Sequence, residues 1–65
     1  MRDTERINSL LRRLSFVWRC SPDLRLGQLL INACEMYGTD LYDVDDYDLL
    51  IFIERMVYDK EENNA

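Results

Sequence analysis

The chain has 65 residues, of which 48% are hydrophobic, and it carries a net charge of −5 with 13 acidic residues, eight basic residues and no histidine. This composition fits one small globular domain and excludes a disordered chain, because disordered segments are poor in apolar residues. Without histidine, and with Cys20 and Cys34 as the only cysteines, the chain lacks the usual parts of a metal centre, a disulfide framework or a nucleophile–base pair. We therefore expect no enzyme activity, no metal and no cofactor.

The first predicted element is a helix over about residues 4–20. Its apolar residues recur at every third or fourth position, as one face of a helix requires: Ile7, Leu10, Leu11, Leu14, Val17 and Trp18. Phe16 lies outside this stripe, among arginines. It is either a partly exposed side chain covered by arginine stems or part of a small aromatic–cationic patch.

Pro22 ends this helix, because proline has no N–H to donate and disfavours helical angles at Ser21. A second helix is predicted over about residues 24–37. Its start falls within residues 23–26. Either Ser21 caps it with Pro22 in the first turn, or Gln28 reaches back to the backbone near Arg25.

The second helix has the most regular apolar stripe in the chain: Leu26, Leu29, Leu30, Ala33, Cys34 and Tyr37. Cys34 lies on this stripe and is predicted to be a small core residue rather than a reactive thiol. Gly38 stands where a left-handed C-cap belongs. Gly27 either permits close approach of another helix or is simply tolerated in the first turn.

Residues 38–45 are predicted to be a linker with three short apolar anchors among acids: Leu41, Tyr42 and Val44. A third helix follows over about residues 46–60, with Asp45 or Asp46 as its N-cap. Its inner stripe is Leu49, Phe52, Ile53 and Met56, flanked by Leu50 and Val57. A second stripe of Tyr47, Ile51 and Tyr58 faces the other way, so this helix is either buried on two sides or carries an interface.

From about residue 61 the chain is predicted to be a frayed acidic tail. No repeat or second domain is visible, and residues 1–65 are predicted to form a single compact all-α domain of three helices. The N-terminus has no apolar block of the signal-peptide kind, and no apolar run is as long as a membrane span. We expect a cytoplasmic protein, in the host cytoplasm if it is phage-encoded, that has no contact with a membrane.

A motif around the proline supports this fold. It consists of Trp18, then residues 22–29 (Pro-Asp-Leu-Arg-Leu-Gly-Gln-Leu), then residues 40–42 (Asp-Leu-Tyr) and the acidic pair Asp45-Asp46. In these residues the chain resembles a group of small bacterial and phage proteins that includes the YihD-like family. The resemblance covers roughly residues 5–57 and implies a small, mainly helical cytosolic protein. It implies no catalytic residues, and it suggests that Arg25 and the Asp45-Asp46 pair form a structural ion pair.

Charge is distributed unevenly along the chain, and this unevenness carries the functional prediction. Residues 1–25 have a net charge of +3, whereas residues 26–65 have a net charge of −8. Carboxylates interleaved with aromatic side chains suit a basic partner, and a row of carboxylates can imitate the charge spacing of duplex DNA. The predicted partner-binding residues are Asp43, Asp45, Asp46, Tyr47, Asp48, Ile51, Glu54 and Tyr58.

The first hypothesis is an acidic protein-interaction module, such as a phage-borne, anti-CRISPR-type inhibitor that mimics nucleic acid and binds a basic nucleic-acid-binding protein. The alternative is a structural or regulatory homo-oligomer, at its simplest a homodimer, that buries Tyr47, Ile51 and Tyr58 against a second copy. Direct binding of nucleic acid by the acidic part is disfavoured because carboxylates repel phosphate. The arginines of the first helix are a weaker third hypothesis for contact with nucleic acid or an anionic surface. A simpler explanation of the acidic residues is that they only keep the protein soluble.

Overall fold

The computed structural model describes residues 4–63, with side chains up to residue 59. This part of the chain forms three helices and no strand: α1 (Glu5–Arg19), α2 (Leu26–Met36) and α3 (Asp46–Asn63). The prediction of an all-α domain of three helices is confirmed. α3 is longer than predicted, since the helix continues through residues 61–63, where a tail was expected; residues 64–65 lie outside the described part.

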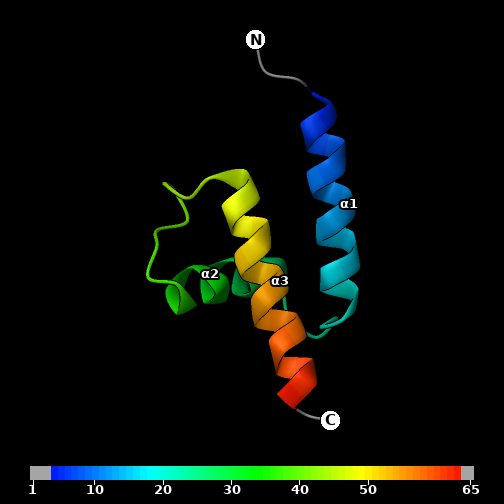
Figure 1. Cartoon of the computed structure of the whole chain (residues 1–65), viewed down its shortest axis with the longest axis vertical. Coiled ribbons are helices and arrows are strands. Elements are labelled where there is room, and N and C mark those ends of the chain that lie inside the picture. The colour runs from blue at the N-terminus through cyan, green and yellow to red at the C-terminus, as the bar shows by residue number, and fades with distance from the viewer. Residues whose placement is uncertain (1–3, 64–65) are drawn as a thin grey trace.

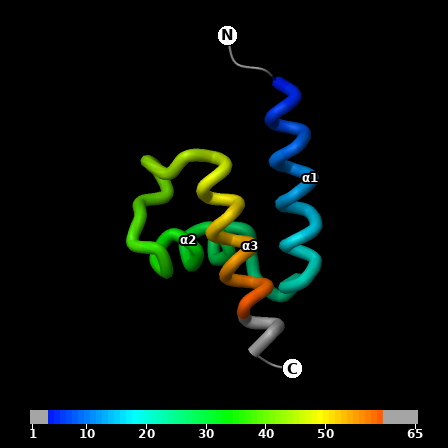
Figure 2. The backbone as a smooth tube through the Cα atoms, viewed as in Figure 1, coloured from blue at the N-terminus to red at the C-terminus, as the bar shows by residue number. Residues whose placement is uncertain are grey.

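α3 is the central helix of the fold. Figure 1 shows α1 beside α3 and running in the same direction, while α2 passes behind α3 at a steep angle and extends away from α1. The backbone trace places the segment between α2 and α3 on the far side of α3 from α1 (Figure 2). The tertiary contacts agree, because α3 packs extensively against both α1 and α2.

The core forms where the three helices meet. Its buried members come from every helix: Val17, Leu29, Ala33, Ile53 and Val57. Seven partly buried apolar residues pack around them: Leu14, Trp18, Leu24, Leu30, Leu49, Phe52 and Met56. Burying a side chain of this size contributes about 1.5–3 kcal/mol, so this cluster is the main source of stability.

The buried face of α3 is rotated from the predicted one. Leu50 and Val57, predicted as flanking residues, are buried together with Ile53, whereas Leu49 and Phe52 are only partly buried. The reason is that α1 and α2 cover α3 from two sides, so the strip of α3 that lies between α1 and α2 is the most deeply buried. The second stripe of Tyr47, Ile51 and Tyr58 is exposed, so burial of α3 on both of its predicted apolar sides is wrong, and an interface on that side stays a prediction.

The apolar stripe of α1 is buried over only part of its width. Val17 is buried, and Leu10, Leu14 and Trp18 are partly buried, but Leu11 remains 57% exposed and Ile7 is also exposed. The predicted apolar stripe is therefore not buried as a whole, and these two residues lie outside the core. α1 packs chiefly against α3, and α3 covers only one side of the stripe.

Hydrogen bonds fix the turn between α1 and α2. The indole Nε1–H of Trp18 donates to the carbonyl oxygen of Leu24 at 2.8 Å, which ties the end of α1 to the entry of α2. α2 begins at Leu26, and the backbone N–H of Arg25 donates to Oε1 of Gln28 at 2.9 Å. This bond confirms that Gln28 reaches back to the helix start and rules out Ser21 as the N-cap.

α2 ends at Met36, one residue earlier than predicted, and Gly38 follows as the left-handed residue of its C-terminal cap, as predicted. The backbone there is left-handed, with φ = +66°. The N–H of Thr39 donates to the oxygen of Cys34 at 2.9 Å, and that of Gly38 donates to the oxygen of Glu35 at 3.2 Å. These two bonds form a Schellman motif, which satisfies carbonyl groups that the helix end leaves unpaired.

Candidate interaction surfaces

The loop before α3 is built from aspartates that bond to the backbone. Oδ1 of Asp40 accepts from the N–H of Tyr42 at 3.1 Å, and the Asp40 carbonyl oxygen accepts from Asp43 and Val44 at 3.0 Å. Oδ2 of Asp45 accepts from the N–H of Tyr47 at 3.1 Å, which identifies Asp45 as the N-cap of α3. The loop is therefore an ordered turn, on which Tyr42 and Asp43 are exposed.

Tyr42 protrudes from this loop. Tyr42 is 92% exposed to solvent, which is the largest fraction among the large hydrophobic residues of the described part. The prediction that Tyr42 is an apolar anchor is wrong, whereas Leu41 and Val44 are each half-buried. The sequence did not identify Tyr42 as a surface residue. Leu41, Tyr42 and Val44 lie close together among acidic residues, and their order gives no sign of which side chains turn inward.

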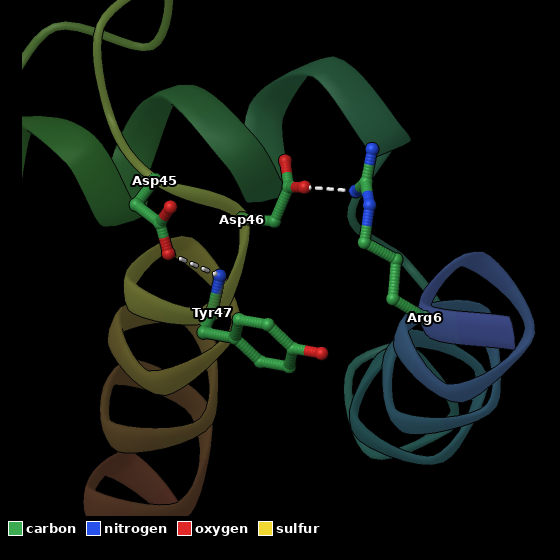
Figure 3. A network of polar contacts seen from close by, with 4 residues as sticks. All are labelled: Arg6, Asp45, Asp46 and Tyr47. Atoms are coloured by element: carbon green, nitrogen blue, oxygen red, sulfur yellow. Dashed lines mark hydrogen bonds and ion pairs between the residues drawn. The ribbon is translucent and has the colours of Figure 1, made fainter. Parts of the chain in front are cut away.

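Two predicted partner-binding acids are instead bound within the chain. Glu54 accepts two hydrogen bonds from Arg13, at 3.0 Å from Nε and 2.7 Å from Nη2, and Asp46 forms an ion pair with Arg6. Figure 3 shows Arg6 reaching from α1 to Asp46 at the start of α3, next to the bond between Asp45 and Tyr47. These pairs hold α1 against α3, so Asp46 and Glu54 have a structural partner already. The ion pair of Asp46 is formed with Arg6 and not with Arg25.

The Arg13–Glu54 pair is bidentate, which is the strong geometry for a guanidinium and a carboxylate. The hydrogen bond to Glu54 raises the pKa of Arg13 and outweighs burial, which acts in the opposite direction. The two side chains are still 34% and 25% exposed, so water screens part of their attraction. The pair contributes to the register of α1 on α3 more than to the total stability.

The other predicted acids remain at the surface. Asp43, Asp45 and Asp48 are exposed. Among the residues whose side chains are described, neither Asp43 nor Asp48 takes part in a side-chain hydrogen bond or ion pair. Together with Asp40 and Tyr42 they form a surface that we call the acidic loop surface, which consists of Asp40, Tyr42, Asp43, Asp45 and Asp48.

The second predicted stripe of α3 lies on the flank that borders α1. Tyr47, Ile51 and Tyr58 share this flank with Glu54, because they follow one another at intervals of three or four residues. Each of the three is partly exposed. Figure 3 shows the ring of Tyr47 extending from α3 toward α1. The structure thus separates the predicted site into the acidic loop surface and this apolar flank.

A shallow apolar groove of about 440 Å³ runs along α1 to the turn. Its lining residues are Leu11, Leu14, Ser15, Trp18, Arg19 and Pro22. The sequence placed Leu11, Leu14 and Trp18 on one apolar stripe but gave no sign of the groove. The stripe on α1 was visible, but only the position of its neighbours decides how much of it is covered.

The remaining chemistry of the described residues is limited. Cys34 is buried, as predicted, and burial raises the pKa of its thiol, so it stays protonated near neutral pH. Among the described residues, no cluster of three or more acidic, cysteine or histidine side chains is placed to hold a metal ion. None of the described helices is long and apolar enough to cross a membrane.

Comparison with known proteins identifies no relative: no protein-family model, no curated protein and no solved structure matches this chain. The resemblance to the YihD-like group therefore stays a prediction that rests on the motif around Pro22.

Proposed function

We propose that the protein is an acidic interaction module that binds a basic protein through the acidic loop surface. The observation that supports this most directly is Tyr42, which is 92% exposed on a loop whose Asp40, Asp43 and Asp45 are also exposed. A large aromatic side chain that leaves water on binding is the kind of residue that dominates interface energetics. Its place on an ordered turn reduces the entropy lost when a partner binds.

The charge around Tyr42 specifies the chemistry of the partner. Asp43 and Asp48 carry charges that no described side chain neutralises. Arginine can bind both the exposed aromatic ring and the unpaired carboxylates of this surface. A guanidinium stacks on an aromatic face and forms paired hydrogen bonds with a carboxylate. An arginine-rich surface is therefore the best complement to the acidic loop surface.

Proteins that bind nucleic acid have such surfaces. Duplex DNA presents one charge per about 1.7 Å along its axis, and proteins that bind it display arginine and lysine in a matching array. The acidic loop surface places four carboxylates within nine residues. We propose that it occupies the nucleic-acid site of its partner, as a phage-borne inhibitor of the anti-CRISPR type would.

The test is capture of partners from nuclease-treated host lysate, at low and high salt, by four immobilised proteins. These are the wild type, Tyr42→Ala, Asp43→Arg and the control Asp59→Arg, which makes the same charge change on an exposed residue far along α3. We expect nucleic-acid-binding proteins that the wild type and the control retain and that high salt releases. The Tyr42→Ala and Asp43→Arg variants should lose them. Capture that is insensitive to salt, or equal for the two arginine variants, contradicts the proposal.

A second candidate is a homo-oligomer, which the partial exposure of Tyr47, Ile51 and Tyr58 along one flank of α3 favours. In such an assembly this flank would pack against the same flank of a second copy. Sedimentation analysis of the wild type and of Ile51→Glu distinguishes it from the first candidate. An oligomer that Ile51→Glu dissociates supports it, and a wild-type monomer at high concentration excludes it.

A further inference from the structure

The groove on α1 has an apolar floor that extends beyond the groove itself. Ile7, Leu11, Leu14 and Trp18 follow one another at intervals of four, three and four residues, which is the spacing of one helix seam. Leu14 and Trp18 are partly covered by the core, but Ile7 and Leu11 are exposed. At the other end Pro22 closes the groove. An apolar helix seam that the fold covers only on one side is a surface on which a second helix can pack.

The two edges of this seam differ in charge. On the edge facing α3, Arg6 and Arg13 are neutralised by Asp46 and Glu54. On the outer edge, Arg12 and Arg19 are exposed, and neither forms a hydrogen bond or an ion pair with any described side chain. They are seven residues apart and so lie on the same side of the helix, and Arg19 itself lines the groove. The outer edge therefore carries positive charge that the carboxylates of a partner would neutralise.

A second copy of this chain is a poor occupant. Pairing two α1 seams about a twofold axis would bring Arg12 and Arg19 of both copies to one interface, and like charges oppose such a contact. The seam from Ile7 to Trp18 is about 17 Å long. At a width of about 10 Å it is much smaller than the ~800 Å² per partner that a stable dimer buries. The area suits one transiently bound helix.

An anionic membrane is also disfavoured. An amphipathic helix that lies on a membrane needs a basic face and a molecule that the lipid charge attracts. Here the net charge of the chain is −5, and the acidic loop surface would repel anionic lipid.

We propose that the groove and seam of α1 bind an acidic amphipathic helix of a partner protein. Its apolar side chains would pack on Leu11 and Trp18, and its carboxylates would pair with Arg12 and Arg19. This is recognition of a helix in an apolar groove, with a bidentate pair at its edge. The site is distinct from the acidic loop surface in both position and charge, so the protein would present one surface to a basic partner and another to an acidic one.

The chain contains its own probe for this site, because Trp18 is the only tryptophan and lines the groove. The test titrates the full-length protein with a helical peptide of about 15 residues that has leucines on one face, glutamates beside them and no aromatic residue. A second peptide has lysine in place of every glutamate. We expect a saturable change of Trp18 emission with the glutamate peptide, and about tenfold weaker binding, or none, with the lysine peptide.

Two variants locate the binding site. Leu11→Glu places a charge in the seam and should weaken binding of the glutamate peptide by about tenfold or more. Ile31→Glu is the matched control, since Ile31 is an apolar residue that is 42% exposed on α2, away from Arg12 and Arg19, and it should bind like the wild type. Both substitutions are at exposed positions, and circular dichroism will confirm that the helices are retained. Arg19→Glu should weaken binding, whereas Arg19→Lys should keep most of it.

Several outcomes would overturn the proposal. These are equal binding of the two peptides, equal effects of Leu11→Glu and Ile31→Glu, and a wild-type dimer that Leu11→Glu dissociates. Binding to phosphatidylserine vesicles that Leu11→Glu abolishes, with no binding of the glutamate peptide, would assign the seam to a membrane instead.

Discussion

The two glycines of the chain show how the role of one residue depends on its backbone. Gly38 has φ = +66°, a conformation that is energetically unfavourable for any residue with a side chain. It closes the Schellman motif of α2. Gly27 lies in the first turn of α2, and a Cβ built there meets no described atom within 4 Å. Close approach of another helix, one of the two roles considered for Gly27, is therefore absent.

Alanine at these two positions should change stability in opposite directions. Gly38→Ala should lower the free energy of unfolding by about 1–2 kcal/mol, because it forces a side chain into the left-handed region. Gly27→Ala should raise it by about 0.5–1 kcal/mol, because it restricts the unfolded chain and meets no obstacle in the helix. Urea unfolding followed by Trp18 fluorescence measures both. Equal effects of the two substitutions would show that the backbone angle at Gly38 has no energetic consequence.

At the scale of elements, polar contacts decide how the helices are aligned. The pairs Arg6–Asp46 and Arg13–Glu54 join α1 to α3 with separations of 40 and 41 residues. Because these separations are nearly equal, the two helices must run in the same direction. The hydrogen bond from Trp18 to the Leu24 carbonyl oxygen then sets the turn that leads into α2. The apolar core holds the helices together, and these contacts select their relative position.

A double-mutant cycle on Arg13 and Glu54 should give a coupling free energy of about 0.5–1 kcal/mol. The estimate lies near the upper end for exposed pairs because the geometry is bidentate while both side chains remain partly exposed. The coupling should decrease as salt is added. The cycle uses Arg13→Ala, Glu54→Ala and the double variant in thermal or urea unfolding. A parallel cycle on Arg12 and Glu54 should show coupling near zero, and similar coupling in both cycles would refute the specific pairing.

At the scale of the whole molecule, stability depends on α3. A core of this size supplies roughly 3–5 kcal/mol of net stability, so there is little reserve against a defect at the centre. α3 contributes Ile53 and Val57 to the core and separates α1 from the loop that follows α2. The same arrangement separates the charges, with the free arginines of α1 on one side of α3 and the acidic loop surface on the other.

Truncation of the central residue should unfold the protein. Ile53→Ala should cost about 2–5 kcal/mol, which equals or exceeds the expected stability, because Ile53 is 0% exposed and alanine leaves a cavity. Ile51→Ala on the same helix, at a residue that is 37% exposed, should cost about 1 kcal/mol or less. Circular dichroism during heating distinguishes them. A cooperative transition for Ile53→Ala near the wild-type temperature would show that the centre of the core lies elsewhere.

The candidate site was predictable in part. The exposed carboxylates of the loop follow from their number and density, and an N-cap at Asp45 or Asp46 follows from their place before an apolar helix, while the structure selects Asp45. Sequence patterns did not show that Asp46 and Glu54 are paired, since their partners lie about 40 residues away. The exposure of Tyr42 also depends on the turn that Asp40 forms, which brings Leu41 and Val44 inward but leaves Tyr42 outside.

The sequence by itself determined the three helices, the proline break and the left-handed end at Gly38, and it narrowed the cap of α2 to Ser21 or Gln28. These features depend on residues a few positions apart, so local chemistry is sufficient to specify them. Tertiary structure alone decided which part of each apolar stripe is buried. Periodicity shows that Leu11 and Val17 share a broad face of α1, but only the position of α3 leaves Leu11 exposed and Val17 buried. It also decided which acids are neutralised, because that depends on which helix lies beside them.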